Sequence, residues 1–421
     1  MRDIAQVQLR DVVSRVAIRN SASNTNVLTI SATHGLVSQE EYFNRRVAST
    51  DLSQYYLLRK GDFAYNKSYS AGWPVGVVRR LQRYKEGVVS PLYICFRPDT
   101  ELVNPSYLQH YFDSGVLNED ILLIAKEGVR NHGLLNVGVE DFFKLPMRLP
   151  TLPEQQRIAE ILDGMDEQIN ALLTEAKKLG ATSAAVLDAQ LRTALRPLEE
   201  TEVSNMAERV GEEVGNFRFI TVGELLVSID AGNSPDLEDR PASEDQWGVL
   251  KVSAVGREGF RERENKRVDS PSLINPSIAV RTGDLLMTRA NTPALVGLSC
   301  VVDKVRPGLM LSDKTLRLNL LPHVGDPLFL DALLRQSATR RQIEVAATGT
   351  SSSMKNISQE SIRNLVVPWM TPSLQANVLV PVSAIRSKRD GLAKEVAKLR
   401  LAKQALMEGL LHGKDRAPTA T

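Results

Sequence analysis

The chain has 421 residues, of which 43% are hydrophobic and 24% are charged, and its formal net charge at pH 7 is +2. A chain of this length is too long for one ordinary core and predicts two domains with connecting elements. No apolar run approaches the roughly 20 residues that cross a bilayer, so a membrane-spanning protein is not expected. A cytoplasmic location is expected instead. A net charge this close to zero neither requires nor excludes nucleic acid, because affinity for phosphates depends on local clusters of Lys and Arg.

The sequence pattern of residues 1–150 predicts a mixed α+β domain. Short runs such as NVLTI, PVGVVRRL and VVSPLYICF are rich in β-branched residues and bounded by Gly, Pro, Ser or Asp, as half-buried strands are. Cys95 and Cys300 both lie in such runs, so buried, reduced thiols are expected. The segment NPSY at Asn104 is similar to the motif that holds the target nitrogen in amino-methyltransferases, but it lacks the second proline, and no Gly-rich loop precedes it. We therefore predict only the start of a helix there, with proline near its first position.

Apolar side chains recur every seven positions in residues 151–196 and again in residues 372–412. This pattern predicts one long helix in each segment. A polar linker, 197–216, follows the first helix, and a flexible tail, 413–421, follows the second. Gly180 lowers the propensity of the first helix, and Pro381 is expected to kink the second helix or to mark its start. The expected buried seam between the helices consists of Ile158, Leu162, Met165, Ile169, Leu172 and Leu179 with Ile385, Leu392, Val396, Leu399 and Leu406.

The two helices are expected to pair in antiparallel fashion. The first would be roughly 65 Å long at 1.5 Å per residue. In a parallel pair, the linker of about twenty residues would have to retrace nearly that whole length, at its limit of about 3.5 Å per residue. Antiparallel packing sets Asp166 near Lys398 and Glu175 near Arg389. Each domain would then lie at the start of its own helix, at opposite ends of a rod.

Residues 217–371 predict a second domain of the same class, because the chain repeats. Gly61 corresponds to Gly283, 222 positions later, and Gln155 corresponds to Gln375, 220 positions later. The predicted fold class is therefore α+β, with two mixed α/β domains separated by two long antiparallel helices. These helices would form an intramolecular coiled coil and give the chain an internal pseudo-two-fold symmetry.

The helix-entry segment LPTLPEQQRIAEILDGMDEQI, with LAKQALMEGLLHG near the C-terminus, resembles the specificity subunit of type I restriction-modification systems. GDFAYNKSYSAGWPVGVVRR in the first domain, and VLKVSAV, GDLLMTRANTPALVG and LSDKTLRL in the second, resemble the target-recognition domains of that family. The resemblance implies a non-catalytic subunit that binds double-stranded DNA, with each domain reading one half of a bipartite, asymmetric site. It also implies that the helices set the gap and dock two modification (methyltransferase) subunits. No cofactor is expected on this chain, since S-adenosylmethionine and ATP would be bound by the modification and the restriction or motor subunits.

The resemblance makes polar loop residues candidates for DNA contact. Lys and Arg contact phosphates, and Arg and Asn can also read guanine and adenine in the major groove. For each candidate the alternative is a solvated loop, a helix cap or a charged strand edge, and Arg83 and Lys85 extend the basic run of the first domain. The candidates are Tyr65, Asn66, Lys67, Ser68, Tyr69, Arg79, Arg80, Arg130, Asn131 and His132 in the first domain, and Lys251, Arg289, Asn291, Thr292, Lys314, Ser351, Ser352, Ser353 and Lys355 in the second.

The sequence supports no catalytic or metal site. No GxxxxGK[ST] phosphate-binding loop occurs, and the histidines have no ligand spacing. The competing interpretation is a protein-protein scaffold with two binding heads on a coiled-coil rod. The histidines without ligand spacing, mentioned above, are His34, His110, His132, His323 and His412.

Overall fold

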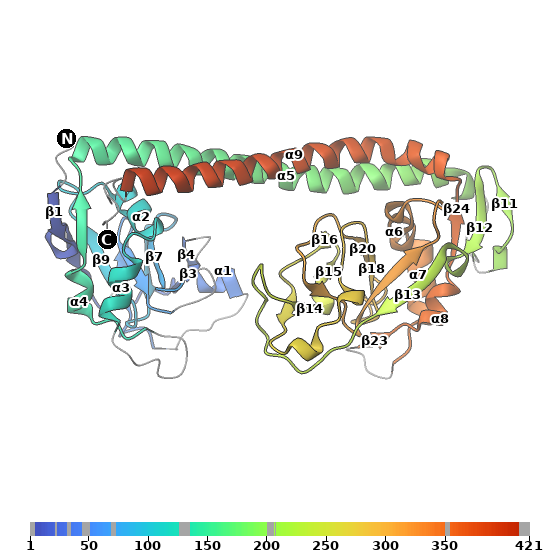
Figure 1. The fold of residues 1–421 in the computed structure, drawn as a ribbon, viewed down its shortest axis with the longest axis horizontal. Helices are drawn as coiled ribbons and strands as arrows, with labels where there is room; N and C mark the ends of the chain where they lie inside the picture. Colours follow the sequence, from blue (N-terminus) through green and yellow to red (C-terminus); the bar gives the residue numbers. More distant parts are fainter. Residues whose placement is uncertain are drawn as a thin grey trace, which may run out of the picture. The chain divides into compact units, whose positions relative to one another are not determined.

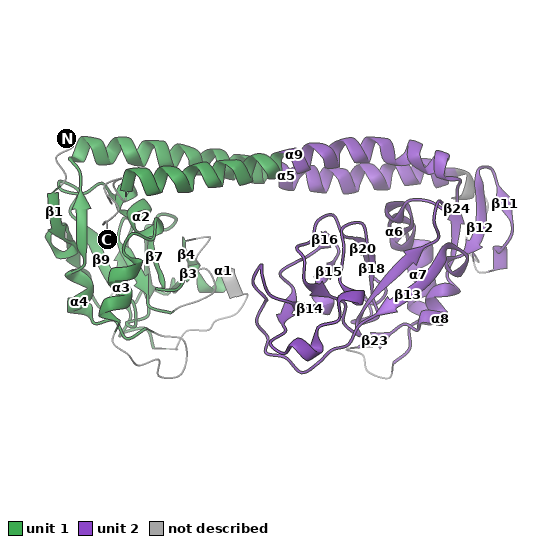
Figure 2. Cartoon of the chain, in the orientation of Figure 1, with its two compact units in different colours: residues 1–174, 392–421 green, residues 175–391 purple. Residues whose placement is uncertain are grey.

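The computed structural model of the protein describes residues 5–21, 23–31, 35–43, 51–68, 73–125, 135–199, 206, 208–349 and 354–411. The chain divides into two compact units, unit 1 with residues 1–174 and 392–421 and unit 2 with residues 175–391 (Figure 2). Each unit contains one mixed α/β domain together with part of α5 (Leu152–Glu199) and part of α9 (Pro372–Leu411) (Figure 1). The predicted fold class of two α+β domains with two long helices is confirmed. Within the described residues, no helix is both long and apolar enough to cross a membrane.

The domain of unit 1 is built on a four-stranded antiparallel sheet in the order β2-β9-β6-β7. These strands are β2 (Val13–Arg15), β9 (Ile94–Pro98), β6 (Phe63–Asn66) and β7 (Val77–Arg80). Three strand pairs surround the sheet: β1 (Ala5–Gln8) with β10 (Pro146–Leu149), β3 (Leu28–Ser31) with β4 (Gly35–Ser38), and β5 (Tyr56–Arg59) with β8 (Glu86–Val89). The helical elements are η1 (Leu9–Asp11), α1 (Gln39–Phe43), α2 (Pro105–Asp113), α3 (Asn118–Ile124) and α4 (Val139–Phe143).

The domain of unit 2 also has a four-stranded antiparallel sheet, in the order β13-β22-β18-β20. Its strands are β13 (Leu226–Ala231), β22 (Thr315–Leu320), β18 (Leu285–Thr288) and β20 (Ser299–Val301). The smaller sheets contain β11 (Glu213–Val214), β12 (Phe217–Thr221) and β24 (Val366–Trp369); β17 (Asn265–Arg267), β14 (Gly248–Leu250) and β21 (Leu309–Met310); β15 (Val255–Gly256) with β16 (Gly259–Phe260); and β19 (Ala290–Asn291) with β23 (Lys355–Asn356). The helical elements are η3 (Val222–Leu225), η4 (Val252–Ala254), η5 (Pro271–Leu273), η6 (Pro276–Ile278), α6 (Pro327–Arg335), α7 (Ser337–Ala346) and α8 (Gln359–Arg363).

The strand registers show that the sequence repeat is a structural one. Phe63 pairs with Phe96 between β6 and β9, and Leu285 pairs with Leu318 between β18 and β22. Both members of the second pair lie 222 positions after those of the first (285 − 63 and 318 − 96). The two central sheets therefore have equivalent strand orders, and the β6–β9 and β18–β22 pairs have the same register.

The turn that leads into the central strand is also shared. Gly61 and Gly283 both have positive φ, +99° and +93°, a conformation that glycine adopts without steric cost. The aspartate after the second glycine, Asp284, accepts the N–H of Arg281 at 2.9 Å, as Asp62 does in the first domain at 2.8 Å from Arg59. The Gly-Asp pair is thus required by a tight turn, which is why it survives in two otherwise different sequences.

Each domain shares its hydrophobic core with the helices of its own unit. In unit 1, the core around Phe96 and Phe142 includes Ile158 of α5 together with Met407 and Leu411 of α9. In unit 2, a core around Phe219, Phe329 and Trp369 includes Leu191 of α5 and Val382 of α9. The helices are therefore part of the folding units rather than separate spacers added to them.

The long helices run antiparallel in both units, which confirms the predicted direction. Lys403 of α9 forms an ion pair with Asp166 of α5 at 2.5 Å, and Lys388 forms one with Glu175 at 2.8 Å. The predicted partners, Lys398 for Asp166 and Arg389 for Glu175, were wrong. The end of α9 is fixed by the burial of Met407 and Leu411 in the first domain, and this shifts the register opposite Asp166 from 398 to 403. Arg389 instead contacts Asp303 of the second domain at 3.0 Å.

The predicted seam is partly correct. Leu406 is 39% exposed, and its neighbour Met407 is buried in its place. A strict seven-residue spacing drifts by about 20° per heptad around a straight helix, whereas the eleven-residue step from Val396 to Met407 is about three whole turns. Of the other predicted positions, Ile158, Leu162, Ile169 and Val396 are buried, and Met165, Leu172, Leu179, Ile385, Leu392 and Leu399 are partly buried.

A buried glutamine at the start of each long helix holds the preceding domain. The Gln155 carboxamide accepts the N–H of Asn104 at 2.8 Å and donates to the carbonyls of Leu102 at 3.1 Å and Pro150 at 2.9 Å. Gln375 accepts the N–H of Asp326 at 2.9 Å and donates to the carbonyl of Met370 at 2.8 Å. The proline-rich segment before each helix thus places a glutamine where it bonds backbone groups that neither helix nor sheet satisfies.

Three local expectations concern helix ends and helix breakers. Asn104 caps α2 by accepting the N–H groups of Ser106 and Tyr107, which confirms that NPSY begins a helix. α9 continues through Pro381 from Pro372 to Leu411, so the second helix does not start at that proline. The predicted flexible tail, 413–421, lies outside the described residues.

Candidate nucleic-acid interface

Tyr65 belongs to the core of the first domain and not to its surface. The side chain is 1% exposed, its hydroxyl donates to the carbonyl of Val75 at 2.6 Å, and its ring stacks on Phe142 with centroids 4.8 Å apart. Burial also raises the pKa of its phenol. The prediction that Tyr65 contacts DNA was therefore wrong, because the side chain of this β6 residue points into the domain.

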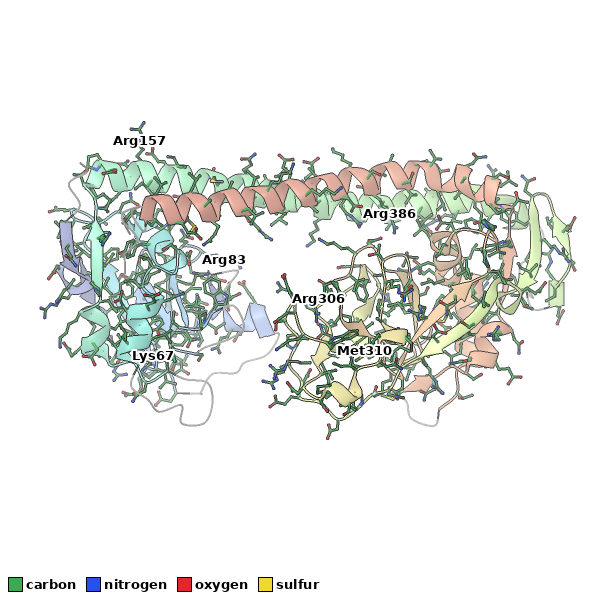
Figure 3. The ribbon with its side chains drawn as sticks, in the orientation of Figure 1. Lys67, Arg83, Arg157, Arg306, Met310 and Arg386 are labelled. Carbon is green, nitrogen blue, oxygen red and sulfur yellow. The ribbon has the colours of Figure 1, made fainter. Side chains whose placement is uncertain are left out.

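Arg79 and Arg80 of β7 are engaged inside the first domain. The Arg79 guanidinium forms an ion pair with Asp113 of α2 at 2.5 Å and lies 5.0 Å from the ring centre of Trp73, and its side chain is only 12% exposed. Arg80 is partly buried, and burial lowers the pKa of its guanidinium. For Arg79, the predicted phosphate contact gives way to a structural role, in which it fixes α2 on the sheet. The phosphate contact of Arg80 stays a prediction. Arg83, labelled in Figure 3, is exposed and paired with Glu41 at 2.9 Å.

Lys67 and Arg289 occupy the same position in the two domains. Each follows the central strand, β6 or β18. The carbonyl of Lys67 accepts the N–H of Leu135 at 3.0 Å, and the carbonyl of Arg289 accepts the N–H of Ile357 at 2.9 Å. Both residues of the second bond lie 222 positions after those of the first (289 − 67 and 357 − 135). A cation at one repeated site is the feature that most directly links the two domains to a shared polyanionic ligand.

The second domain brings four predicted residues together from distant parts of the sequence. The N–H of Arg289 donates to the carbonyl of Lys314 at 2.9 Å, and Asn291 pairs with Lys355 between β19 and β23. Arg289 and Lys314 are exposed. Asn291 accepts the N–H of Thr292 at 2.8 Å, which orders the turn that follows. Cations and amides of this kind on one surface suit contact with phosphates and base edges.

The remaining described candidates have local partners. Lys251 forms ion pairs with Asp239 at 2.9 Å and Glu264 at 3.9 Å, and the hydrogen bond to Asp239 raises the pKa of its ammonium group. Asn66 accepts the N–H of Ser68 at 3.1 Å. Tyr69, Arg130, Asn131, His132, Ser351, Ser352 and Ser353 lie outside the described residues.

A serine, a histidine and an aspartate meet in unit 1 without the geometry of a nucleophilic site. The Asp163 carboxylate of α5 accepts from Ser106 Oγ at 2.8 Å and lies 2.8 Å from His110 Nε2. Ser106 is bonded to the carboxylate and not to the imidazole, so the serine–histidine hydrogen bond of such a site is not formed. The cluster fastens α2 to α5. Within the described residues, no group of three or more potential metal ligands occurs.

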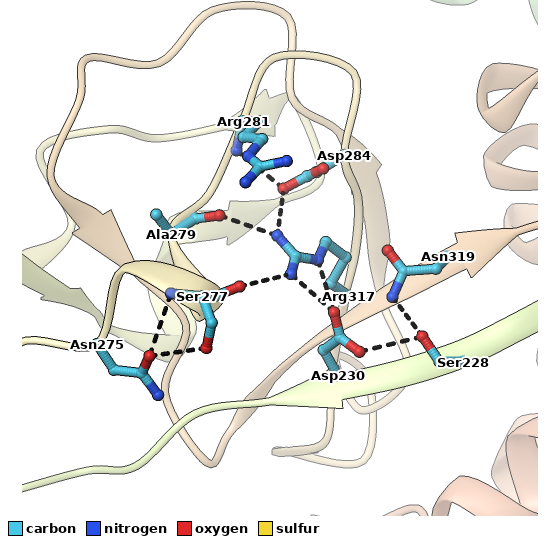
Figure 4. A network of polar contacts seen from close by, with 9 residues as sticks. All are labelled: Ser228, Asp230, Asn275, Ser277, Ala279, Arg281, Asp284, Arg317 and Asn319. Carbon is cyan, nitrogen blue, oxygen red and sulfur yellow. Dashed lines mark hydrogen bonds and ion pairs between the residues drawn. The ribbon is translucent and has the colours of Figure 1, made fainter.

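Sequence reasoning missed a buried arginine that organises the second domain (Figure 4). The Arg317 guanidinium donates to Asp230 at 2.7 Å, to Asp284 at 3.2 Å and to the carbonyl of Ala279 at 2.9 Å. Burial disfavours the Asp230 carboxylate, but hydrogen bonds from its neighbours and the Arg317 charge outweigh this and lower its pKa. The only signal in the sequence is a cation inside the apolar strand TLRLNL. The network joins β22, β13 and the Gly-Asp turn, so it supports the candidate interface rather than forming part of it.

Comparison with known proteins finds a relative that resembles part of this chain. Over 164 residues, the chain is 35% identical to the specificity subunit of the type I restriction enzyme EcoEI from Escherichia coli, and this match covers 39% of the chain and 28% of that relative. This chain thus spans less than a third of the curated relative it matches. No protein-family model matches the chain.

Three solved structures align with nearly the whole chain. The HsdS subunit from Thermoanaerobacter tengcongensis is 16% identical, with 97% of each chain covered and a TM-score of 0.40. The S subunit of a type I restriction-modification system from M. genitalium is 14% identical, with 97% of this chain and 96% of that chain covered and a TM-score of 0.45. A chain from a structure on the assembly and conformational transition of a type I system is 17% identical, with 97% of each covered and a TM-score of 0.45. The sequence match to the EcoEI subunit confirms that this chain resembles the specificity subunits of type I restriction-modification systems.

Proposed function

We propose that the chain is the sequence-specific DNA-binding subunit of a type I restriction-modification complex, and that each domain reads one half of a bipartite, asymmetric site. The observation that carries the proposal is the repeated cationic position, Lys67 in the first domain and Arg289 in the second, held by equivalent backbone hydrogen bonds. A ligand that carries regularly spaced negative charge can meet both positions. Duplex DNA is such a ligand.

The surroundings of the two positions differ in the way that two different half-sites require. Arg289 lies beside Lys314 and close to Asn291, so the second domain presents a guanidinium that can bond guanine and an amide that can bond adenine. Lys67 carries an ammonium in place of the guanidinium and has no arginine or asparagine at the positions that follow it directly. A shared anchor with unlike neighbours supports recognition of an asymmetric sequence.

The helices are proposed to fix the gap between the half-sites and to bind two modification subunits. Their domain-facing sides are buried, while Ile161, Leu173 and Leu401 in unit 1 are 45%, 40% and 72% exposed. Exposed aliphatic side chains on an otherwise polar helix pair are suited to a protein partner. The methyl donor S-adenosylmethionine and ATP are proposed to bind those partner subunits and the motor subunit, so that this chain contributes recognition and no catalytic group.

The test uses the chain assembled with its modification subunits. Adenine methylation in a host that carries the system is first mapped by sequencing, and a bipartite motif is expected. Binding to a duplex with that motif is then measured over a range of salt concentrations. The Lys67→Gln and Arg289→Gln variants should each reduce the slope of log K against log salt by about 1, which is the effect of losing one phosphate contact.

A matched control is Lys60→Gln, which removes an exposed lysine of the first domain that is not at the repeated position. Its slope should equal that of the unaltered complex. If the complex binds duplex DNA without any salt dependence, or if methylation maps to no bipartite motif, the DNA-reading function is refuted and the scaffold interpretation takes its place.

A further inference from the structure

The first domain contains a small cavity that two cationic residues from distant parts of the chain line. The cavity has a volume of about 120 Å³, and Arg15 of β2 and Lys67 after β6 line it together with Tyr56 and Tyr93. Lys67 is labelled in Figure 3. Among the described residues that line it, none is acidic. Two cationic side chains therefore border one cavity whose described wall holds no acidic side chain.

Three arginines elsewhere in this domain each have an acidic partner. Arg79 is paired with Asp113, Arg83 with Glu41 and Arg97 with Asp62. By contrast, the structure gives the Arg15 guanidinium no hydrogen bond or ion pair within its described part. Among the described residues, the Lys67 ammonium donates to the carbonyl of Val137, at 3.5 Å, and to no other group. Two positive charges that border one cavity without an acid repel one another, and an anion from outside the chain would relieve that repulsion.

The size of the cavity selects the kind of anion. A volume of about 120 Å³ suits a compact oxyanion and is well below the roughly 300 Å³ or more of pockets that enclose a whole small-molecule ligand. Lys67 is at the same time the repeated cationic position of the proposed DNA surface. We propose that the cavity binds one phosphate group of the DNA backbone in the first half-site, with Arg15 and Lys67 as its donors. This inference rests on the proposed function.

The second domain does not repeat this arrangement. Arg15 lies opposite Phe96 in the β2–β9 pair, and the equivalent place in the β13–β22 pair, opposite Leu318, is taken by Ile229. Ile229 is buried in the hydrophobic core and carries no charge. The phosphate site is thus a property of the first domain alone, and Arg289 meets the DNA without a second cation at that place.

The experiment replaces backbone phosphates one at a time. Duplexes with the bipartite motif carry a single uncharged methylphosphonate at successive positions of the first half-site, and their affinity for the complete complex with modification subunits is measured. One position should lower affinity about tenfold for the unaltered complex. At that position, the methylphosphonate should cause no further loss of affinity in the Arg15→Gln and Lys67→Gln complexes, because their phosphate contact is already absent. In the Lys60→Gln complex, the methylphosphonate should cause the full tenfold loss of affinity.

The remaining outcomes separate the sources of phosphate and the two proposals. The conservative Arg15→Lys should keep most of the sensitivity at the same position. If, at every position, the fold-loss of affinity caused by Arg15→Gln and the fold-loss caused by the methylphosphonate multiply as independent effects do, the phosphate site is refuted. If inorganic phosphate, titrated against chloride at matched ionic strength, binds the cavity while no methylphosphonate position is coupled to Arg15, the cavity holds free anions and the proposal is overturned. Failure of the unaltered complex to bind any duplex would instead overturn the proposed function, on which this site depends.

Discussion

The buried glutamine at the start of α5 makes a prediction about stability. Gln155→Ala removes a side chain that is 1% exposed and makes three hydrogen bonds to backbone groups of unit 1. It leaves one N–H and two carbonyl groups without partners, and each such buried group costs about 1 kcal/mol or more. We expect the free energy of unfolding of unit 1 to fall by about 3 kcal/mol. With a urea dependence of about 1 to 3 kcal/mol per molar, the midpoint should fall by about 1 M or more.

Urea unfolding of the purified chain, followed by circular dichroism and by tryptophan fluorescence, measures this change. Gln156→Ala is the matched control, because Gln156 is the neighbouring residue and is exposed, and its effect should stay within about 0.5 kcal/mol. Gln375→Ala, which removes two hydrogen bonds to backbone groups of unit 2, should cost about 2 kcal/mol there. Equal effects of Gln155→Ala and Gln156→Ala would refute the reasoning that the segment before each helix exists to place a buried amide.

Three further predictions concern charged and titrating groups. Burial raises the pKa of Cys95 and Cys300 to about 12, so both thiols should resist alkylation at pH 8 until the chain unfolds. The free energy of unfolding, measured in urea, should fall as the pH rises above about 9, because only the unfolded chain releases the thiol protons there. Arg317→Met leaves two carboxylates without their cation and should lower the free energy of unfolding by about 3 kcal/mol, measured in the same assay. Reversing both charges of the Asp166–Lys403 pair should restore most of what either single reversal loses, with a coupling of at most about 1 kcal/mol in a double-mutant cycle.

The architecture was accessible from the sequence because its repeated elements are fixed by stereochemistry. Gly61 and Gly283 recur because the turn needs positive φ, and Gln155 and Gln375 recur because each satisfies buried backbone groups. Such positions tolerate few substitutions, so they mark the offset between the halves even where the loops have diverged. The direction of the helix pair followed from the length of the linker alone, which is a limit of chain geometry.

The individual contacts were less accessible because they depend on which way a side chain points. Tyr65 and Lys67 are two residues apart in one polar segment, yet Tyr65 is buried and Lys67 is partly exposed beyond the strand end. The type of residue did not separate them, and neither did the neighbouring sequence. Likewise the meeting of Arg289 with Lys314 is set by the pairing of β18 with β22, which has no local signature.

The difference between Lys67 and Arg289 has a consequence for recognition. A lysine ammonium is a point charge that suits a phosphate, whereas the planar guanidinium can form two parallel hydrogen bonds to guanine as well. Arg289→Lys should therefore relax base preference in the second half-site while it leaves the salt dependence of binding nearly unchanged, because the charge is kept. Lys67→Arg should preserve both the salt dependence and the preference of the first half-site. Selection of preferred sites from randomised duplexes by the two complexes measures this contrast, and a change of preference in the first half-site with Lys67→Arg would show that Lys67 reads a base rather than a phosphate.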